Sequence, residues 1–330
     1  TMAIALIGTV AGAALGALPS DKLGRKNTLF AVAALYFISA IGSALANDWT
    51  IFILFRFLGG IGVGVSSVTA PIYISEISPA ASRGKLVGLF QFNVVLGILI
   101  AYLSNYFIGQ LGEESWRWML GVQCFPSLLF FVLIFFIPES PRWLLLHKNN
   151  LSEATKIMKR INSEDYELEI EKIQESNDKM AGEGKLFIRE NAKPILLALC
   201  FALFNQLSGI NAIIYYAPRV FEMAGLGSQS SLLSTVGIGV INFIFTLVAI
   251  NFIDKVGRKK LMLVGSLGLI VSLALVSQAF YTGQTTGFAI TIYLMSFIAF
   301  FAFSQGAVIW VFISEIFPND VRAKGQTFGS

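Results

Sequence analysis

Three side-chain amides stand close together in residues 204–218, FNQLSGINAIIYYAP. Asn205 and Gln206 precede Gly209, a residue that can break a helix, and Asn211 follows it. Each amide offers hydrogen-bond donors and an acceptor but carries no charge. The stretch therefore predicts a binding site for a neutral ligand with several hydroxyl groups. The alternative is that these amides only join helices to one another by hydrogen bonds.

Other polar and aromatic side chains in apolar stretches extend this candidate site. They are the amides Gln91, Asn93 and Asn242 and the aromatic residues Tyr215, Tyr216 and Trp310. An aromatic ring can stack on the apolar face of a sugar, so these rings suit the same kind of ligand. For the isolated amide Asn93, hydrogen bonding between helices is the preferred interpretation.

Two charged motifs each occur twice in the chain. SDKLGRK (20–26) resembles IDKVGRK (253–259), and SEISPAASRGK (75–85) resembles SEIFPNDVRAK (314–324). The two copies are separated by nearly the same number of residues in both cases. This spacing indicates one internal duplication, in which both halves cross the membrane in the same orientation.

The duplicated motifs carry charges that suit ion pairs. In each half an Arg follows a Glu by seven residues, and a second Arg comes from the other motif. The expected members are Arg25, Glu76 and Arg83 in the first half and Arg258, Glu315 and Arg322 in the second. Such clusters at the cytoplasmic ends of helices would hold that side of the protein closed. The alternative is that these charges only fix the topology.

The composition shows what must position these residues. Of the 330 residues, 55% are hydrophobic and 13% are charged, about half the charged fraction of a soluble domain. Apolar runs of about 20 residues can each cross a membrane as a helix. The sequence thus predicts an all-α polytopic membrane protein. The nine expected spans are 1–18, 27–46, 51–75, 86–109, 118–138, 193–222, 231–253, 261–281 and 286–314.

Basic residues set the orientation of these spans. Of the 24 Lys and Arg residues, 21 lie in alternate loops, which the positive-inside rule places in the cytoplasm. The polar segment 139–192 belongs to this set, and Ser152 is expected to cap a helix in it. The net charge of +4 thus reflects membrane topology, and a nucleic-acid partner is not expected.

Few other groups in the spans could do chemistry. Arg56 lies about 9 Å into its span at the rise of an α-helix, where an arginine is functional by default unless it reaches the surface. GGIGVG (59–64) predicts close helix packing. Neither a Ser/His/Asp set nor a metal-binding cluster is recognisable, so an enzyme, a metal site and a cofactor are not expected.

Several motifs together are similar to those of the sugar porter family of major facilitator transporters. They are DKLGRK (21–26), RFLGGIGVG (56–64), WRWMLG (116–121), PESPRWL (138–144), QLSGINAIIYYAP (206–218) and WVFISEIFPNDVRAKG (310–325). The resemblance implies the major facilitator fold, with two parallel six-helix repeats. The chain would run from the second to the tenth helix. It implies transmembrane halves at 1–138 and 193–330 and a cytoplasmic helical linker domain at 139–192.

The resemblance also implies roles for individual residues. Sugar contacts would come from Gln91, Asn205, Gln206, Asn211, Asn242 and Trp310, and an outer gate from Tyr215 and Tyr216. The cytoplasmic salt-bridge network would comprise Arg25, Glu76, Arg83, Glu139, Arg142, Arg258, Glu315 and Arg322. Arg56 is the candidate for a coupling or conformational role.

The chain departs from the family pattern at a few positions. Asn205 replaces a Gln and so shortens one amide by a methylene, Ala307 replaces a Pro, and Ala17 replaces a Gly. Gln123 stands where the proton symporters of the family carry an acid. Proton coupling would therefore depend on an acid in the first helix, beside Arg56, and otherwise the carrier would be a facilitator.

The function implied is alternating-access transport of a neutral monosaccharide, a hexose or pentose, by a multi-pass protein of the plasma membrane. The expected partners are the sugar, the lipid bilayer and, in a symporter, protons; the protein is expected to act as a monomer. Two alternatives are a major facilitator carrier of a polyol or an organic acid, and a sugar sensor that binds without transport.

Overall fold

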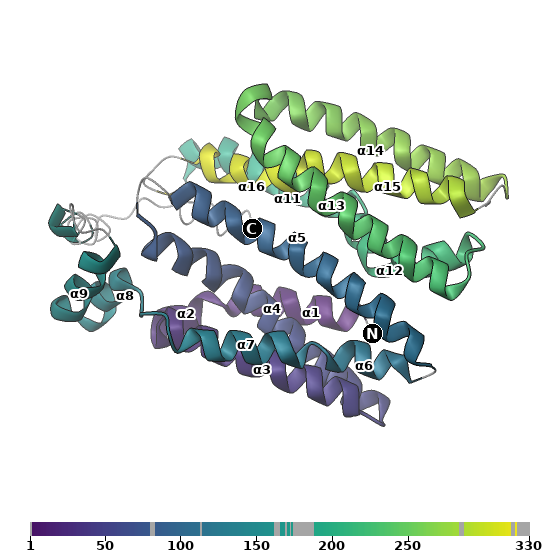
Figure 1. Cartoon of the computed structure of the whole chain (residues 1–330). Coiled ribbons are helices and arrows are strands. Elements are labelled where there is room, and N and C mark those ends of the chain that lie inside the picture. The colour runs from purple at the N-terminus through teal and green to yellow at the C-terminus, as the bar shows by residue number, and fades with distance from the viewer. Residues whose placement is uncertain are drawn as a thin grey trace. The chain divides into compact units, whose positions relative to one another are not determined.

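The computed structural model is helical throughout the elements that it describes (Figure 1). The described residues are 2–79, 83–112, 114–161, 166–168, 170, 171, 173, 188–283, 287–317 and 321. The helices are α1 (Met2–Leu15), α2 (Ala17–Leu23), α3 (Arg25–Leu45), α4 (Trp49–Ile77), α5 (Arg83–Ile108), α6 (Ser115–Gly121), α7 (Cys124–Ile134), α8 (Pro141–Lys148), α9 (Leu151–Ile161), α11 (Ala192–Leu207), α12 (Ile210–Met223), α13 (Ser228–Val256), α14 (Arg258–Tyr281), α15 (Gly287–Phe303) and α16 (Gln305–Ile316), with 3-10 turns at Gly109–Leu111 and Arg189–Asn191.

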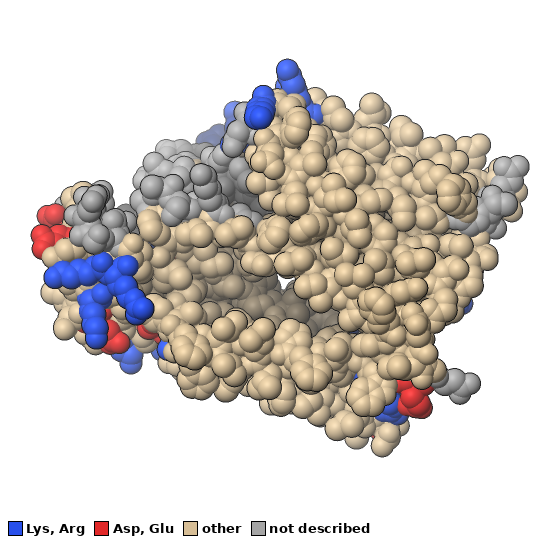
Figure 2. Space-filling model, viewed as in Figure 1, with Lys and Arg blue, Asp and Glu red and all other residues tan. Residues whose placement is uncertain are grey.

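The prediction of an all-α membrane protein with about nine spans is confirmed. Eight helical segments of the described chain are long and apolar enough to cross a membrane. A ninth is formed by α1 and α2 if this pair, bent by 48°, is counted as one span. On the face drawn in Figure 2, charged side chains gather at α8 and α9 and at helix ends, and the helix flanks are uncharged. Such flanks suit a hydrocarbon environment.

The chain forms two compact units. One comprises Thr1–Phe90 with Gly112–Glu183, and the other Gln91–Leu111 with Gly184–Ser330. The outer part of α5 therefore belongs with the helices of the C-terminal part of the chain.

In the first unit, α1 and α4 pack with their backbones almost in contact. A Cβ atom at Gly8 would collide with the carbonyl oxygen of Phe57, and one at Gly64 with that of Thr9. These glycines replace side chains at the interface and so let the two helices approach closely, as the motif GGIGVG predicts.

Side chains hold the outer ends of helices in the same unit. The carboxylate of Asp48 accepts hydrogen bonds from the backbone N–H groups of Thr50 and Ile51 at the start of α4, and these bonds lower the pKa of that carboxyl group. Arg117 in α6 donates to the carbonyl oxygens of Ala44 (3.0 Å) and Ala46 (2.8 Å) at the end of α3. A cation is favourable there because it faces the negative end of the helix dipole.

The cytoplasmic helices α8 and α9 pack through a small apolar core that includes Trp143, Ala154 and Met158. The expectation that Ser152 caps α9 is wrong. The helix starts at Leu151, and the side-chain oxygen of Asn150 accepts a hydrogen bond from the N–H of Glu153 at 3.1 Å. An Asn one residue before the helix can reach this N–H group, whereas Ser152 already lies in the first turn.

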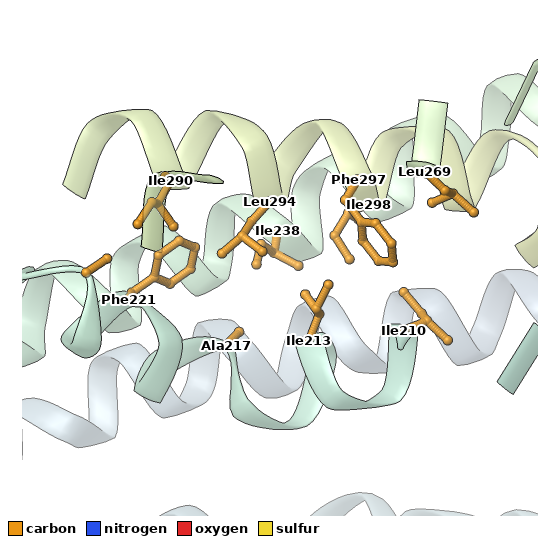
Figure 3. Packing of buried hydrophobic residues seen from close by; sticks show 12 residues of the cluster. Ile210, Ile213, Ala217, Phe221, Ile238, Leu269, Ile290, Leu294, Phe297 and Ile298 are labelled. Carbon is orange, nitrogen blue, oxygen red and sulfur yellow. The ribbon is translucent and has the colours of Figure 1, made fainter. Parts of the chain in front are cut away.

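In the second unit, α12 packs one apolar stripe against α13 and α15. Figure 3 shows Ile210, Ile213, Ala217 and Phe221 on this side of α12, facing a row of α15 side chains that includes Leu294. The spacing of three to four residues puts all four on one face of the helix. On this side, α12 is supported by apolar side-chain contacts.

Candidate functional site

The predicted break in the span from Ala192 to Met223 is confirmed. Helix α11 ends at Leu207, α12 begins at Ile210, and Gly209 between them has a φ angle of +83°. A Cβ atom at Gly209 would meet no atom of the described residues within 4 Å, so glycine is required there for its backbone conformation and not for space. A discontinuous helix of this kind is where transporters build their midplane sites.

Two of the predicted amides are paired across this break. The side-chain nitrogen of Asn211 donates to the amide oxygen Oε1 of Gln206 at 2.5 Å. The bond orients both groups, and it uses only one acceptor oxygen and one N–H. The remaining N–H groups of Gln206 and the oxygen of Asn211 can therefore bind a hydroxyl group.

Asn205 directly precedes Gln206 in the chain and is more buried than either member of this pair. The residue is 7% exposed, and its buried side-chain oxygen has no hydrogen-bond partner among the described residues. A buried acceptor without a partner is unfavourable and rare in folded proteins. The role of this oxygen as a contact to a sugar hydroxyl group stays a prediction.

The other predicted contact residues belong to the same compact unit. Gln91 in α5 is half-buried, and Asn242 in α13 is 7% exposed. Trp310 lies in α16, but its side chain is outside the described residues. Asn93 is exposed, as is Gln206. The assignment of Gln91, Asn242 and Trp310 to a sugar site stays a prediction.

Tyr215 and Tyr216, the predicted outer gate, lie on α12 and are both substantially exposed. They follow Asn211 on the same short helix, so a movement of α12 would carry both rings and one amide of the candidate site together.

At the cytoplasmic end of the first unit, Arg25 forms the predicted ion pair with Glu76. The guanidinium donates to both carboxylate oxygens, at 2.9 and 3.0 Å, and both side chains are more than nine-tenths buried. Its remaining nitrogen donates to the carbonyl oxygen of Ser20 and to the carboxylate of Asp21, each at 3.1 Å. This two-pronged geometry is the strongest form of an arginine–carboxylate contact.

Glu139 serves the same cluster in a different way. Its carboxylate accepts hydrogen bonds from the backbone N–H groups of Arg25 (3.0 Å), Lys26 (3.1 Å) and Ser140 (2.8 Å). It therefore caps the start of α3, where the helix dipole favours an anion. Gly24 makes this approach possible, since a Cβ atom there would collide with the Glu139 carboxylate.

The second copy of the motif repeats the backbone geometry of the first. Gly24 has φ +94° and ψ +163°, and Gly257 has φ +86° and ψ +146°. Arg258 then opens α14 as Arg25 opens α3, and it is half-buried.

The other predicted members of the network are described less fully. The side chains of Arg83 and Glu315 and the whole of Arg322 lie outside the described residues. Arg142 is half-buried in α8, and its described surroundings give it no ion pair. Arg56 is half-buried and is the eighth residue of α4.

The structure adds partners that the sequence analysis did not single out. Asp21 joins the Arg25 cluster, and the indole nitrogen of Trp143 donates to the carbonyl oxygen of Asp21 at 2.7 Å. Lys26 donates to the carbonyl oxygen of Ile137 at 2.8 Å. Asp21 lies in α2 and Arg25 opens α3 beyond the turn between the two helices, so the pairing rule for one helix does not apply to them. Over the described residues, no group of three His, Cys, Asp or Glu side chains is placed to hold a metal ion.

Comparison with known proteins gives one family. The model of a family described as "Sugar (and other) transporter" matches residues 1–330. The D-xylose–proton symporter of Escherichia coli is 38% identical, with 98% of this chain and 70% of the symporter covered. The arabinose–proton symporter of Bacillus subtilis is 39% identical, with 97% of this chain and 70% of that protein covered. A glucose transporter of Staphylococcus epidermidis is also 39% identical, with 98% and 72% covered.

Solved structures give the same result. A partially occluded, inward-open structure of the xylose transporter from E. coli superposes with a TM-score of 0.86 at 36% identity. The match covers 99% of this chain and 76% of that transporter. The structural similarity thus extends over nearly the whole of this chain.

Proposed function

Since the chain belongs to the sugar porter family of the major facilitator superfamily, we propose that it carries a neutral monosaccharide across the plasma membrane by alternating access. The substrate is a hexose or a pentose. The observation that carries this proposal is the set of uncharged amides at the break between α11 and α12, of which Gln206 and Asn211 are already paired.

This amide set suits a sugar for a chemical reason. Each sugar hydroxyl can donate one hydrogen bond and accept others, and each amide does both. Asn205 presents a buried oxygen that needs a donor, and the free N–H groups of Gln206 need an acceptor. Such a pattern favours a polyhydroxylated neutral molecule over an organic acid, which would require a cation at this place.

The two transmembrane halves, 1–138 and 193–330, would move about the bound sugar, with 139–192 as the cytoplasmic linker domain. The Arg25–Glu76 pair supports a role for the charge network in closing the cytoplasmic side. A buried ion pair of this geometry has one defined arrangement, which must break before the helices that carry it can separate. The half-buried Arg258 at the equivalent position supports a second cluster in the other half.

Proton coupling is the preferred energy source, because several relatives are named proton symporters. The spans as described place no carboxylate at mid-membrane, and an arginine such as Arg56 does not titrate at physiological pH. In a symporter the titrating acid would therefore have to lie outside these spans and be paired with Arg56. Gln123, in place of an acid, favours the second candidate, facilitated diffusion.

Counterflow into proteoliposomes tests the transport proposal. Vesicles loaded with unlabelled xylose, arabinose or glucose are diluted into the labelled sugar, and transient accumulation of label is measured. Accumulation with at least one of these sugars, absent from protein-free vesicles, is the expected result. Tight sugar binding without counterflow would point to a sensor, and neither binding nor counterflow would reject a sugar ligand.

A further inference from the structure

Helix α12 contains a proline, Pro218, in its interior. A proline has no backbone N–H group, so it cannot donate to the carbonyl oxygen four residues earlier. In α12 this carbonyl belongs to Ile214. Within a membrane span, a carbonyl that loses its helical partner requires another donor.

Tyr102 of α5 supplies that donor. Its phenolic O–H donates to the carbonyl oxygen of Ile214 at 2.8 Å. The ring lies against Gly239 of α13, where an added Cβ atom would approach Tyr102 Cδ2 to 2.9 Å. A residue larger than glycine at 239 would thus displace the ring from its position at Ile214.

We propose that Tyr102 is a positioning residue for α12, because its phenol replaces the hydrogen bond that Pro218 removes from this helix. The apolar stripe of α12 against α15 has no directional contact, so it permits small rotations of the helix. The phenol–carbonyl bond is directional and fixes one rotation. With Gly209 as the hinge, breaking this bond releases α12 to move.

The consequence for transport rests on the proposed function. Helix α12 carries Asn211 of the candidate sugar site as well as Tyr215 and Tyr216 of the candidate outer gate. A bond that fixes α12 keeps the amide and the gate rings in one arrangement. Its loss increases the opening of the outer side.

Thiol labelling of α12 measures this directly. The reporter is Ala212→Cys, an exposed position on the same helix face as Tyr215 and Tyr216, in a protein with Cys124→Ser and Cys200→Ser. Tyr102→Phe keeps the ring and removes the hydroxyl. We expect it to raise the rate of labelling by a membrane-impermeant maleimide about 2- to 12-fold, the effect of one lost hydrogen bond.

Two further variants separate this role from simple packing. Tyr106→Phe, one helical turn along α5, is the matched control and should leave the rate unchanged. In Pro218→Ala the restored N–H can bond the Ile214 carbonyl, so Tyr102→Phe should then change the rate less than twofold. An equal increase in both backgrounds, or no increase in either, would overturn the proposal.

Hydrogen exchange gives an independent measure if Pro218→Ala does not fold. Tyr102→Phe should speed exchange in residues 210–223 relative to Tyr106→Phe, and equal exchange would contradict the proposal. Both measurements work without a substrate, so a negative counterflow result, which bears on the proposed function, leaves this test intact.

Discussion

Among single residues, the amide pair at the helix break makes the sharpest prediction. Gln206→Ala removes the acceptor that orients Asn211 as well as one set of donors. We expect weaker sugar binding by about 0.5–1.5 kcal/mol, or more if Asn211 is left without a partner. Isothermal titration calorimetry of the purified variant with the sugar measures this change in binding free energy.

The exposed amide Asn93 provides the control for this prediction. Asn93→Ala removes the same chemical group from another helix of the same compact unit and should leave the affinity unchanged. Equal losses in the two variants would show that the effect is not specific to the site.

The buried ion pair of Arg25 makes a second prediction. Glu76→Gln removes the buried partner of the Arg25 guanidinium and leaves only the more exposed Asp21 as its ion-pair partner among the described residues; losing one partner of a buried pair costs about 3–5 kcal/mol. We expect a lower midpoint of thermal unfolding in detergent. The remaining ion pair between Arg25 and Asp21 should offset part of this loss of stability. Glu114→Gln is the matched control, because the Glu114 side chain is 73% exposed beside Arg117 and such pairs contribute about 0–1 kcal/mol. A similar loss of stability in both variants would contradict the assignment.

At the scale of elements, the two copies of the glycine turn differ in what surrounds them. Gly24 and Gly257 share a backbone conformation that is nearly restricted to glycine, so an alanine costs about 1–3 kcal/mol at either position. Only at Gly24 would the new methyl group also displace the Glu139 carboxylate, because a Cβ atom at Gly257 meets no atom of the described chain within 4 Å.

Gly24→Ala should therefore lower the free energy of unfolding more than Gly257→Ala does. The comparison needs only the midpoints of thermal unfolding for the two purified variants. Equal midpoints would mean that Glu139 adjusts without cost, and would remove its carboxylate as the reason for glycine at position 24.

Elements were easier to predict from the sequence than the contacts between them. The spans follow from apolar runs, and the break at Gly209 follows from one residue and the length of its span. The capping role of Glu139 could not be predicted from physical rules alone, because 114 residues separate it from Arg25. The bond from Tyr102 to Ile214 spans 112 residues, and only Pro218 hinted that this carbonyl lacks a partner.

For the whole molecule, the testable question is the source of energy. If the carrier is a symporter, an imposed pH gradient, acidic outside, should drive sugar accumulation in proteoliposomes, and a protonophore should abolish it. Accumulation requires a group that gains and loses a proton during the cycle, and Arg56 does not supply one. Equal uptake with and without the protonophore would leave facilitated diffusion.

The internal duplication was visible in the sequence because charged turns are short and their residues are specific. The grouping of residues 91–111 with the C-terminal helices was not visible, because it depends on which faces of long apolar helices meet. Periodicity identifies a helix in a membrane span, but a helix that is apolar all round does not reveal its neighbours.

Both ends of helix α3 form hydrogen bonds with side chains of one segment, residues 117–139. The Glu139 carboxylate holds its first N–H groups, and the Arg117 guanidinium holds its last carbonyl groups. To slide by one helical turn, about 5.4 Å, α3 would have to break both sets of bonds at once. Helix α3 is therefore expected to move as one rigid body with the segment that carries Arg117 and Glu139, so that a displacement of its cytoplasmic end also moves its outer end.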